Sequence, residues 1–212
     1  MVLVYKDRKD AGRHLLRHLE HMDFQNPLVL GIPRGGVVVA GEVAAGLGAD
    51  LDVVMAKKVG APFNPEFAIA AVDVEGNITL LEEEQHFPYL DYIRAEAEAL
   101  QREIERKLDY YRNGNSPRDI LGRDVILVDD GLATGLTALA AIKYLRRHRP
   151  NRIILAVPCA PQATLDFLAD YVDVEVCPLV PLYFYAVGQC YVEFGQTSDD
   201  EVKDILSPFM SQ

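Results

Sequence analysis

Six short runs of apolar residues are spaced along the chain and separated by amphipathic stretches. The runs are rich in Val, Ile and Leu and lie at 28–32, 51–56, 67–72, 125–128, 153–157 and 172–177. Runs of this length and composition are typical of strands that are buried on both faces. Residues 10–22, 37–47 and 136–145 instead carry apolar residues at helical spacing. This alternation predicts an α/β fold with a mostly parallel sheet flanked by helices.

The region after the third run departs from the alternation. Gly76 and Asn77 stand between two apolar runs, which predicts a hairpin. A long charged helix is then predicted over 92–112, with a buried stripe formed by Ile93, Ala97, Leu100, Ile104 and Leu108. A polar loop containing Gly and Pro leads to the next strand. We interpret 77–122 as a helical insertion in a core that spans about 24–76 and 123–180.

The last part of the chain, 181–212, is rich in aromatic residues and is expected to form a small C-terminal hood over the sheet. Ser198 and Glu201 have the spacing of a helix capping box. The aromatic residues at 183–185 can stack on a planar ligand, but packing in the core or at an interface is the favoured interpretation. We expect residues 1–212 to form a single domain, since this length suffices for one continuous core.

Composition narrows the range of partners. The formal net charge of the 212 residues is −11, which disfavours sequence-independent binding to nucleic acid. An anionic ligand therefore needs a strong local site. The three cysteines have no CxxC spacing, so neither a disulfide framework nor a zinc site is indicated, and a reducing cytoplasm is expected. We identify no targeting segment and no stretch apolar enough to span a membrane.

The stretch VILVDDGLATGLTALAAI, residues 125–142, carries the strongest chemical signal. Its apolar strand ends in two adjacent aspartates, Asp129 and Asp130, and a loop of small residues then opens a helix. Neighbouring carboxylates repel each other, so cations, hydrogen-bond donors or water must stabilise them. Sheets of this class bind ligands at the carboxyl ends of their strands. The motif therefore marks a candidate ligand site.

The loop after the aspartates is suited to a phosphate. Residues 134–137 present free backbone N–H groups at a helix N-terminus, where the helix dipole favours an anion. The carboxylates can accept hydrogen bonds from vicinal sugar hydroxyls or meet a hydrated Mg²⁺. A phosphate and a diol side by side describe a ribose 5-phosphate. The alternative is an ordinary turn that the aspartates cap, although a single aspartate would suffice for that.

A second loop of the same kind follows the first apolar run, in the sequence IPRGGVVVAG. Gly35 and Gly36 let the backbone fold tightly around an anion, and Arg34 can form two parallel hydrogen bonds to phosphate oxygens. Lys57 and Lys58 end the second run and add positive charge beside both loops. Taken alone, PRGG is equally compatible with a plain helix start. A lysine pair is likewise compatible with a solvated surface.

At these residues the chain resembles the type I phosphoribosyltransferases. Their binding motif for phosphoribosyl pyrophosphate (PRPP) is a hydrophobic strand, two acidic residues and a small-residue loop, as in VILVDDGLATG. The resemblance covers the core from about residue 28 to 177. It implies that Asp129 and Asp130 hold the ribose hydroxyls and that 133–137 hold the 5-phosphate. It also implies that 34–36 form the pyrophosphate loop and that Lys57 or Lys58 contacts the pyrophosphate.

The resemblance thus assigns two sets of residues. The expected substrate-binding residues are Pro33, Arg34, Gly35, Gly36, Asp129, Asp130, Gly131, Leu132, Ala133, Thr134, Gly135, Leu136 and Thr137. The candidate catalytic residues are Arg34, Lys57, Lys58, Asp129 and Asp130. The implied cofactor is Mg²⁺, which bridges pyrophosphate and ribose and meets Asp129 and Asp130 partly through water.

The expected activity is Mg²⁺-dependent transfer of ribose 5-phosphate from PRPP to a nitrogen nucleophile, with release of pyrophosphate. Family members that use 6-oxopurines resemble one another in having an aspartate where this chain has Ala133, so another nucleobase is the expected acceptor. The insertion lies where the family keeps a mobile loop. The alternatives are a regulatory protein that binds PRPP or a nucleotide with little turnover, and a phosphatase-like enzyme, for which DDG lacks the DxD pattern. The partners expected are small molecules, and a homo-oligomer is compatible with the sequence.

Overall fold

The computed structural model describes residues 4–80 and 88–210. Its helices are α1 (Arg8–Leu19), α2 (Gly35–Leu47), α3 (Leu90–Arg112), α4 (Leu136–Arg147), α5 (Gln162–Leu168) and α6 (Asp199–Met210), with short 3₁₀ helices η2 (Ala169–Tyr171) and η3 (Val187–Cys190). Its strands are β1 (Leu28–Gly31), β2 (Asp50–Val53), β3 (Ala56–Ala61), β4 (Asn64–Asp73), β5 (Ile78–Leu80), β6 (Asp124–Val128), β7 (Arg152–Ala156) and β8 (Val174–Val176).

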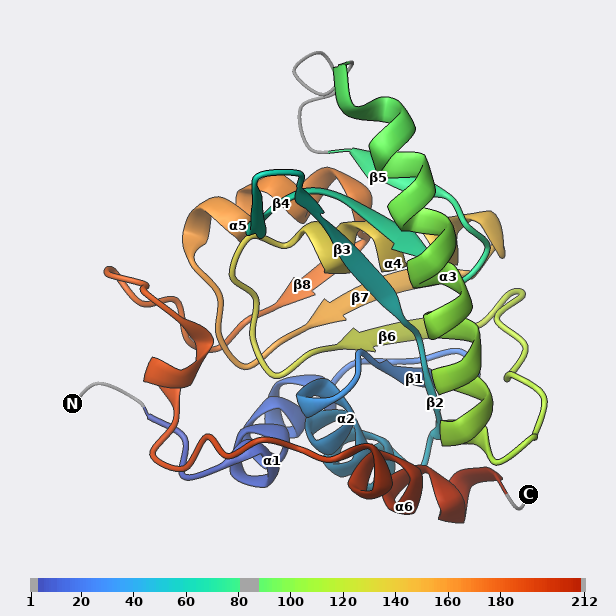
Figure 1. The fold of residues 1–212 in the computed structure, drawn as a ribbon. Helices are drawn as coiled ribbons and strands as arrows, with labels where there is room; N and C mark the ends of the chain where they lie inside the picture. The colour runs from blue at the N-terminus through green and yellow to red at the C-terminus, as the bar shows by residue number, and fades with distance from the viewer. Residues whose placement is uncertain (1–3, 81–87, 211–212) are drawn as a thin grey trace.

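Five of the strands form a parallel sheet in the order β2-β1-β6-β7-β8. Alternate residues of β6 face opposite sides: Ile126 and Val128 pack with α1, α2 and α6, whereas Val125 and Leu127 pack with α4 and α5. Figure 1 shows these two helical layers on either side of the sheet. The predicted α/β fold with a mostly parallel sheet is therefore confirmed.

The order of the strands positions the ligand site. The chain moves outward from β1 to β2 in one direction and from β6 to β7 in the other, so the topology reverses between the neighbours β1 and β6. In open α/β sheets the helices that follow two such strands lie on opposite faces and leave a crevice at the carboxyl ends. The first turns of α2 and α4 both open at this point.

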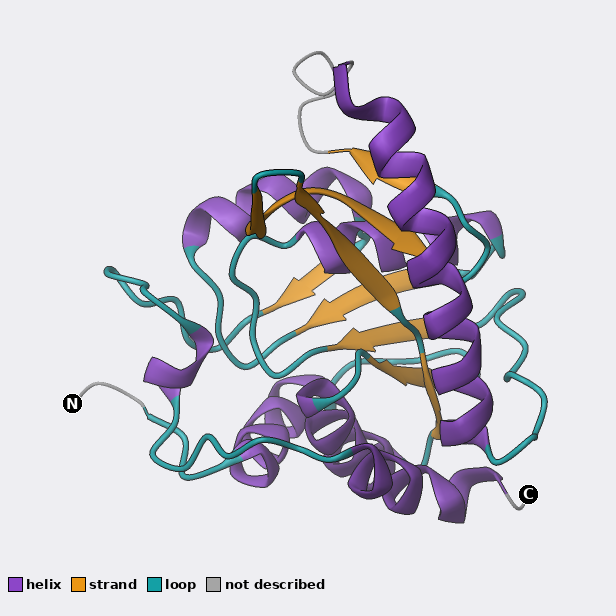
Figure 2. Cartoon of the chain, viewed as in Figure 1, coloured by secondary structure: helices purple, strands orange, loops and turns teal. Residues whose placement is uncertain are grey.

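A second, antiparallel sheet has the order β3-β4-β5 and stands apart from the first (Figure 2). Two sequence interpretations are therefore wrong. The apolar run 51–56 is not one strand, because β2 ends at Val53 and the chain enters β3 at Ala56. The run 67–72 belongs to β4 and not to the parallel sheet; α3 and α4 pack against it, which explains why residues 69–72 are buried. The hairpin at Gly76 is confirmed between β4 and β5.

Helix α3 confirms the long helix predicted over 92–112 and begins two residues earlier. Its apolar stripe is buried except at Leu100, which is half-buried. Its last residue is anchored by an ion pair: Nε of Arg112 lies 2.9 Å from Oδ1 of Asp52 in β2. The two side chains are 13% and 2% exposed. The same guanidinium donates a hydrogen bond to the carbonyl of Val53. The end of helix α3 is thereby fixed to the edge strand β2, while the helix also packs against β3 and β4 (Figure 1).

The C-terminal part of the chain crosses back to the N-terminal part. Tyr5 forms a β-bridge with Tyr191, and α6 packs against α3, α2 and β2. The predicted capping box is confirmed, since Ser198 and Glu201 exchange two hydrogen bonds at the start of α6. Helix α5 was missing from the predicted elements. No helix among residues 4–80 and 88–210 has the length and apolarity needed to cross a membrane.

The division into core, insertion and hood stays a prediction. Within the described residues, 181–198 contain only the short helix η3, and Tyr183 and Tyr185 are 72% and 88% exposed. These two side chains are thus not packed in the core of this chain, and packing at an interface stays a prediction.

Candidate functional site

The two predicted loops meet at the carboxyl ends of β1 and β6. A Cβ atom on Gly36 would stand 2.8 Å from Cα of Asp129, and one on Gly35 would overlap Oδ2 of Asp130. Real side chains do not tolerate such distances, so glycine is required for this close approach. The first turn of α2 therefore lies directly against the aspartate pair. The structure places Pro33, half-buried, at the entrance to this turn.

The aspartate pair is held by three hydrogen bonds. The backbone N–H of Asp130 donates to Oδ1 of Asp129 at 2.8 Å. Nε of Arg8 donates to Oδ2 of Asp130 at 2.7 Å, and the hydroxyl of Tyr191 donates to the backbone carbonyl of Asp130 at 2.5 Å. Sequence reasoning missed Arg8, because it lies in the charged run YKDRKDAGR, where no spacing indicates which carboxylate it meets.

The two carboxylates are electrostatically different. Burial, and after it the neighbouring charge of Asp130, raises the pKa of Asp129 well above its usual range, and Lys58 acts weakly in the opposite direction. Asp130 faces the guanidinium of Arg8 instead. The pair therefore consists of one carboxylate with an arginine partner and one that takes up a proton more readily.

A hollow of about 170 Å³ lies over the loop that follows the pair. Residues 131–138, Asp129, Lys58 and Val187 line it. Gly135 precedes α4 with a φ of 77°, and no side chain caps this helix. The first backbone N–H groups of a helix have no partner within it. Ala133 and Thr134 are exposed at this opening, so the hollow combines free donors with the positive end of a helix dipole.

Two residues of the expected binding set turn away from the hollow. The side chains of Leu132 and Leu136 are 3% and 1% exposed and belong to the core. The backbone N–H of Leu132 donates to the carbonyl of Cys159, so it is not available to a ligand. Of these two residues, only Leu136 can contribute a backbone donor. The buried side chains of Leu132 and Leu136 fix the two ends of the loop to the core. The exposed residues between them, Ala133 and Thr134, are left to face a ligand.

Lys57 and Lys58 point to opposite sides of the strand that contains them. Lys57 and Lys58 lie within β3 and do not end β2, so the predicted position was wrong. Neighbouring residues of a strand point to opposite sides. Lys58 is exposed and lines the hollow, whereas Nζ of Lys57 lies 2.6 Å from Oε2 of Glu103 on α3. The hydrogen bond from Lys57 lowers the pKa of Glu103.

Arg34 precedes α2 and is half-buried. In the part of the chain that the structure describes, no carboxylate forms an ion pair with it. The charge of Arg34 also acts on Asp199 in α6. A hydrogen bond from Tyr111 lowers the pKa of Asp199, and the charges of Lys107 and Arg34 lower it as well. Arg34 is thus a cation at the crevice that is available to an anionic ligand.

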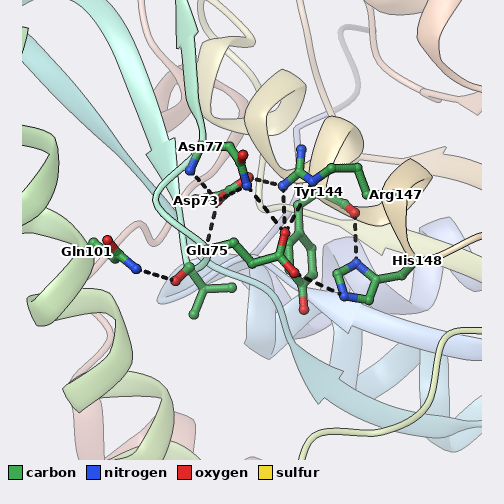
Figure 3. Close-up of polar contacts among 8 residues, drawn as sticks. Asp73, Glu75, Asn77, Gln101, Tyr144, Arg147 and His148 are labelled. Carbon is green, nitrogen blue, oxygen red and sulfur yellow. Dashed lines mark hydrogen bonds and ion pairs between the residues drawn. The ribbon is translucent and has the colours of Figure 1, made fainter. Parts of the chain in front are cut away.

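A cluster outside the crevice fixes the geometry of Lys58 indirectly. Arg147, near the end of α4, pairs with Asp73 and Glu75, and His148 lies 3.3 Å from Glu75 (Figure 3). Asp73 is 2% exposed and ends β4, the neighbour of β3. These contacts fasten the β3–β4 ribbon to the helix whose first turn forms the hollow. These contacts therefore fix the position of Lys58 relative to the loop 131–137.

The described residues contain no group of three or more His, Cys, Asp and Glu side chains that could hold a metal ion. Asp129 lines the hollow and Asp130 follows it, so their carboxylates are candidate hard oxygen donors. Mg²⁺ commonly binds through one or two carboxylates, with water and ligand phosphates completing its shell. The donor set therefore fits a Mg²⁺ ion that arrives with a phosphorylated ligand.

Comparisons with known proteins show what the chain as a whole is similar to. The phosphoribosyl transferase domain family matches residues 4–178. A Mycobacterium tuberculosis (strain H37Rv) protein named as a phosphoribosyl transferase is 42% identical over 207 residues, which are 96% of this chain and 46% of the relative. A uracil phosphoribosyltransferase of Caulobacter vibrioides is 36% identical over 88 residues, 42% of this chain and 39% of the relative. The chain thus spans about half the length of the curated relatives it matches.

One solved structure is similar over the whole chain. The protein TT1426 from Thermus thermophilus superposes with a TM-score of 0.84 at 40% identity, covering 97% of this chain and 99% of that one. A protein of Aquifex aeolicus, AQ2163, has a TM-score of 0.50 at 14% identity over 80% of this chain, a similarity of fold alone.

Proposed function

The chain belongs to the type I phosphoribosyltransferase family, and from this premise we propose that it transfers ribose 5-phosphate from PRPP to a nitrogen nucleophile and releases pyrophosphate. The observation that carries the proposal is the contact between the two loops at Gly36 and Asp129. It brings two sites for anionic groups and a pair of hydroxyl acceptors into a single crevice.

The parts of PRPP have distinct places in this crevice. The hollow over 133–137 takes the 5-phosphate, because free backbone donors and the start of α4 converge there. Asp129 and Asp130 accept hydrogen bonds from the two ribose hydroxyls. The first turn of α2, with Arg34 beside it, takes the pyrophosphate. Lys58, which lines the hollow together with Asp129, adds positive charge beside the ribose. Lys57 is engaged by Glu103 and has no direct role in this arrangement.

Mg²⁺ fits the proposal through the chemistry of its donors. Asp129 and Asp130 would hold the ion, partly through water, and the oxygens of PRPP would complete its shell. When bound, the ion neutralises charge on the pyrophosphate. This matters in a chain with a net charge of −11, where an unaccompanied pyrophosphate would be repelled.

The chain's own residues promote the reaction by position and charge. The bond from C1 of the ribose to a pyrophosphate oxygen breaks, a bond from C1 to the acceptor nitrogen forms, and that nitrogen loses its proton. The ribose ring gains positive charge during this exchange. Arg34 and Lys58 stabilise the departing pyrophosphate. The fixed 5-phosphate and hydroxyls keep C1 aligned between the two reactants.

The acceptor we propose is a nucleobase other than a 6-oxopurine. Position 133 is an exposed alanine at the mouth of the hollow, so no carboxylate is available there to exchange a proton with a 6-oxopurine. The partial similarity to a uracil phosphoribosyltransferase makes uracil the first acceptor to test.

The test is consumption of PRPP with Mg²⁺ against a panel of pyrimidines, purines and small amines, with pyrophosphate release as the readout. We expect release with one acceptor class and little release with hypoxanthine or guanine. The Asp129→Asn/Asp130→Asn protein is the matched control. Binding of PRPP without release for any acceptor would support a regulatory binding protein, and absence of binding would contradict the proposal altogether.

A further inference from the structure

Arg8 is the residue outside the two loops that touches the aspartate pair most closely. Its Nε lies 2.7 Å from Oδ2 of Asp130, and the two side chains are 13% and 15% exposed. A Cβ on Gly35 would stand 2.5 Å from the same Nε atom. Arg8 thus fills the junction where the turn at Gly35 meets the carboxylate of Asp130, although it belongs to α1.

The C-terminal segment holds the guanidinium from its other side. Nη1 of Arg8 donates a hydrogen bond of 2.6 Å to the carbonyl of Gly195. The centre of the guanidinium lies 4.0 Å from the centroid of the Phe194 ring, which suits a cation–π contact. Contacts with Asp130, Gly195 and Phe194 therefore hold the guanidinium in one position. An arginine that only offsets charge at the surface would not need these three contacts.

The position of the Arg8 guanidinium matters because of the charges around Asp129 and Asp130. Asp129 and Asp130 are adjacent carboxylates, and Lys58 from β3, Arg8 from α1, and the neutral hydroxyl and thiol of Tyr191 and Cys159 are the titratable groups that face them. Lys58 stands on the exposed wall of the hollow. Arg8 is therefore the cation that directly offsets the repulsion within the pair before a ligand arrives.

We propose that Arg8 is a positioning residue for ribose recognition: its guanidinium holds the Asp130 carboxylate in one orientation against the Gly35 turn. Asp130 then offers an acceptor of fixed orientation to a ribose hydroxyl. This inference rests on the proposed function, and it adds a residue that neither loop motif contains.

The test compares three variants on α1. Arg8→Gln removes the positive charge together with the planar guanidinium group, and Arg8→Lys keeps only the charge. Arg13→Gln is the matched control, because it removes the same charge from an arginine whose side chain is 52% exposed. Affinities for PRPP with Mg²⁺, for ribose 5-phosphate and for pyrophosphate are measured by calorimetry at a single pH. Melting temperatures of the free proteins show that each variant is folded and provide a readout that needs no ligand.

We expect Arg8→Gln to lose about tenfold to a hundredfold in affinity for PRPP and for ribose 5-phosphate, since a hydrogen bond to a charged group is worth about 1.5–3 kcal/mol. Its affinity for pyrophosphate should stay close to that of the wild type, because the pyrophosphate does not contact Asp130 in the proposed arrangement. Arg8→Lys should lose only severalfold in affinity for ribose 5-phosphate. Arg13→Gln should match the wild type.

Each contrary outcome has a separate meaning. A wild type that fails to bind PRPP contradicts the proposed function. Wild-type binding with equal losses of ribose 5-phosphate and pyrophosphate affinity in Arg8→Gln, or with no loss of either, would overturn the inference alone and assign Arg8 to fastening the C-terminal segment. Should Arg8→Gln not fold, unchanged affinity for ribose 5-phosphate in Arg8→Lys would overturn it.

Discussion

The backbone of Asp129 lies so close to Gly36 that a Cβ on the glycine would stand 2.8 Å from Cα of the aspartate and 3.0 Å from the carbonyl oxygen of Val128. The first turn of α2 and the end of β6 are therefore in backbone contact. This contact joins the sites proposed for pyrophosphate and for ribose, since neither loop can move without displacing the other. It explains why a glycine is needed one residue inside the helix.

Replacing Gly36 with alanine should disturb both loops at once. Because the added methyl group meets backbone that cannot rotate away, we expect a loss of about 1–3 kcal/mol in stability. Binding of ribose 5-phosphate and of pyrophosphate should both weaken, as measured by calorimetry. Gly41→Ala is the control on the same helix, since its Cβ would meet only a side-chain atom of Ile205. Weakening of pyrophosphate alone would show that the two sites are independent.

The two lysines of β3 should differ in their effect on ligand binding. Lys58→Met removes a cation that lines the hollow, and we expect about a tenfold loss in affinity for PRPP, equivalent to about 1.4 kcal/mol. Lys57→Met should have a smaller effect, because Lys57 is paired with Glu103. Calorimetry at low and at physiological salt separates the two. Equal losses would mean that the lysines act only through the general field of the protein.

Arg112 should matter for stability and little for binding. Arg112→Met leaves Asp52, 2% exposed, without its partner, and loss of one member of a buried ion pair costs about 3–5 kcal/mol. In a chain of this size that corresponds to a fall of about 6–20 °C in melting temperature. Arg102→Met, an exposed arginine on the same helix, should change stability by less than about 0.5 kcal/mol. A similar loss in both variants would contradict the anchoring of α3 at Asp52.

The aspartate pair predicts opposite effects of two asparagine substitutions on the free protein. The raised pKa of Asp129 means that its ionised form destabilises the fold, and this cost disappears as pH falls through that pKa. Asp129→Asn should therefore raise the melting temperature at pH 8, with an advantage that shrinks toward pH 5. Asp130→Asn should lower it at pH 8, because Arg8 loses its partner. Matching profiles for the two variants would refute the difference between the carboxylates.

Much of the fold and of the candidate site could be predicted from local pattern. Strand β6 is apolar on both faces from Val125 to Val128, and small residues mark the start of α4, so the strand, loop and helix around Asp129 follow from spacing alone. The capping box at Ser198 is equally local. Each of these features depends on neighbours within a few residues.

The remaining features depend on contacts between distant segments. Residues 51–56 are buried throughout, so apolarity could not reveal that Val53 ends one sheet and Ala56 begins another. Arg8 and Asp130 are 122 residues apart, and many other arginines could have met that carboxylate. The separation of Lys57 from Lys58 required the position of α3, which supplies Glu103. The break between the two sheets, the Arg8–Asp130 contact and the separation of the two lysines all depend on tertiary packing.

The central claim is that the Asp129–Asp130 pair holds the ribose of PRPP, and the Mg²⁺-dependent thermal shift tests it most directly. At about one hundred times its dissociation constant, PRPP should stabilise the native protein by roughly 2.7 kcal/mol, which for this chain length is about 5–10 °C. EDTA should remove most of this shift. The Asp129→Asn/Asp130→Asn protein should remain folded and show almost none of it. A full Mg²⁺-dependent shift in that variant would contradict the claim and reduce the pair to a cap of the turn.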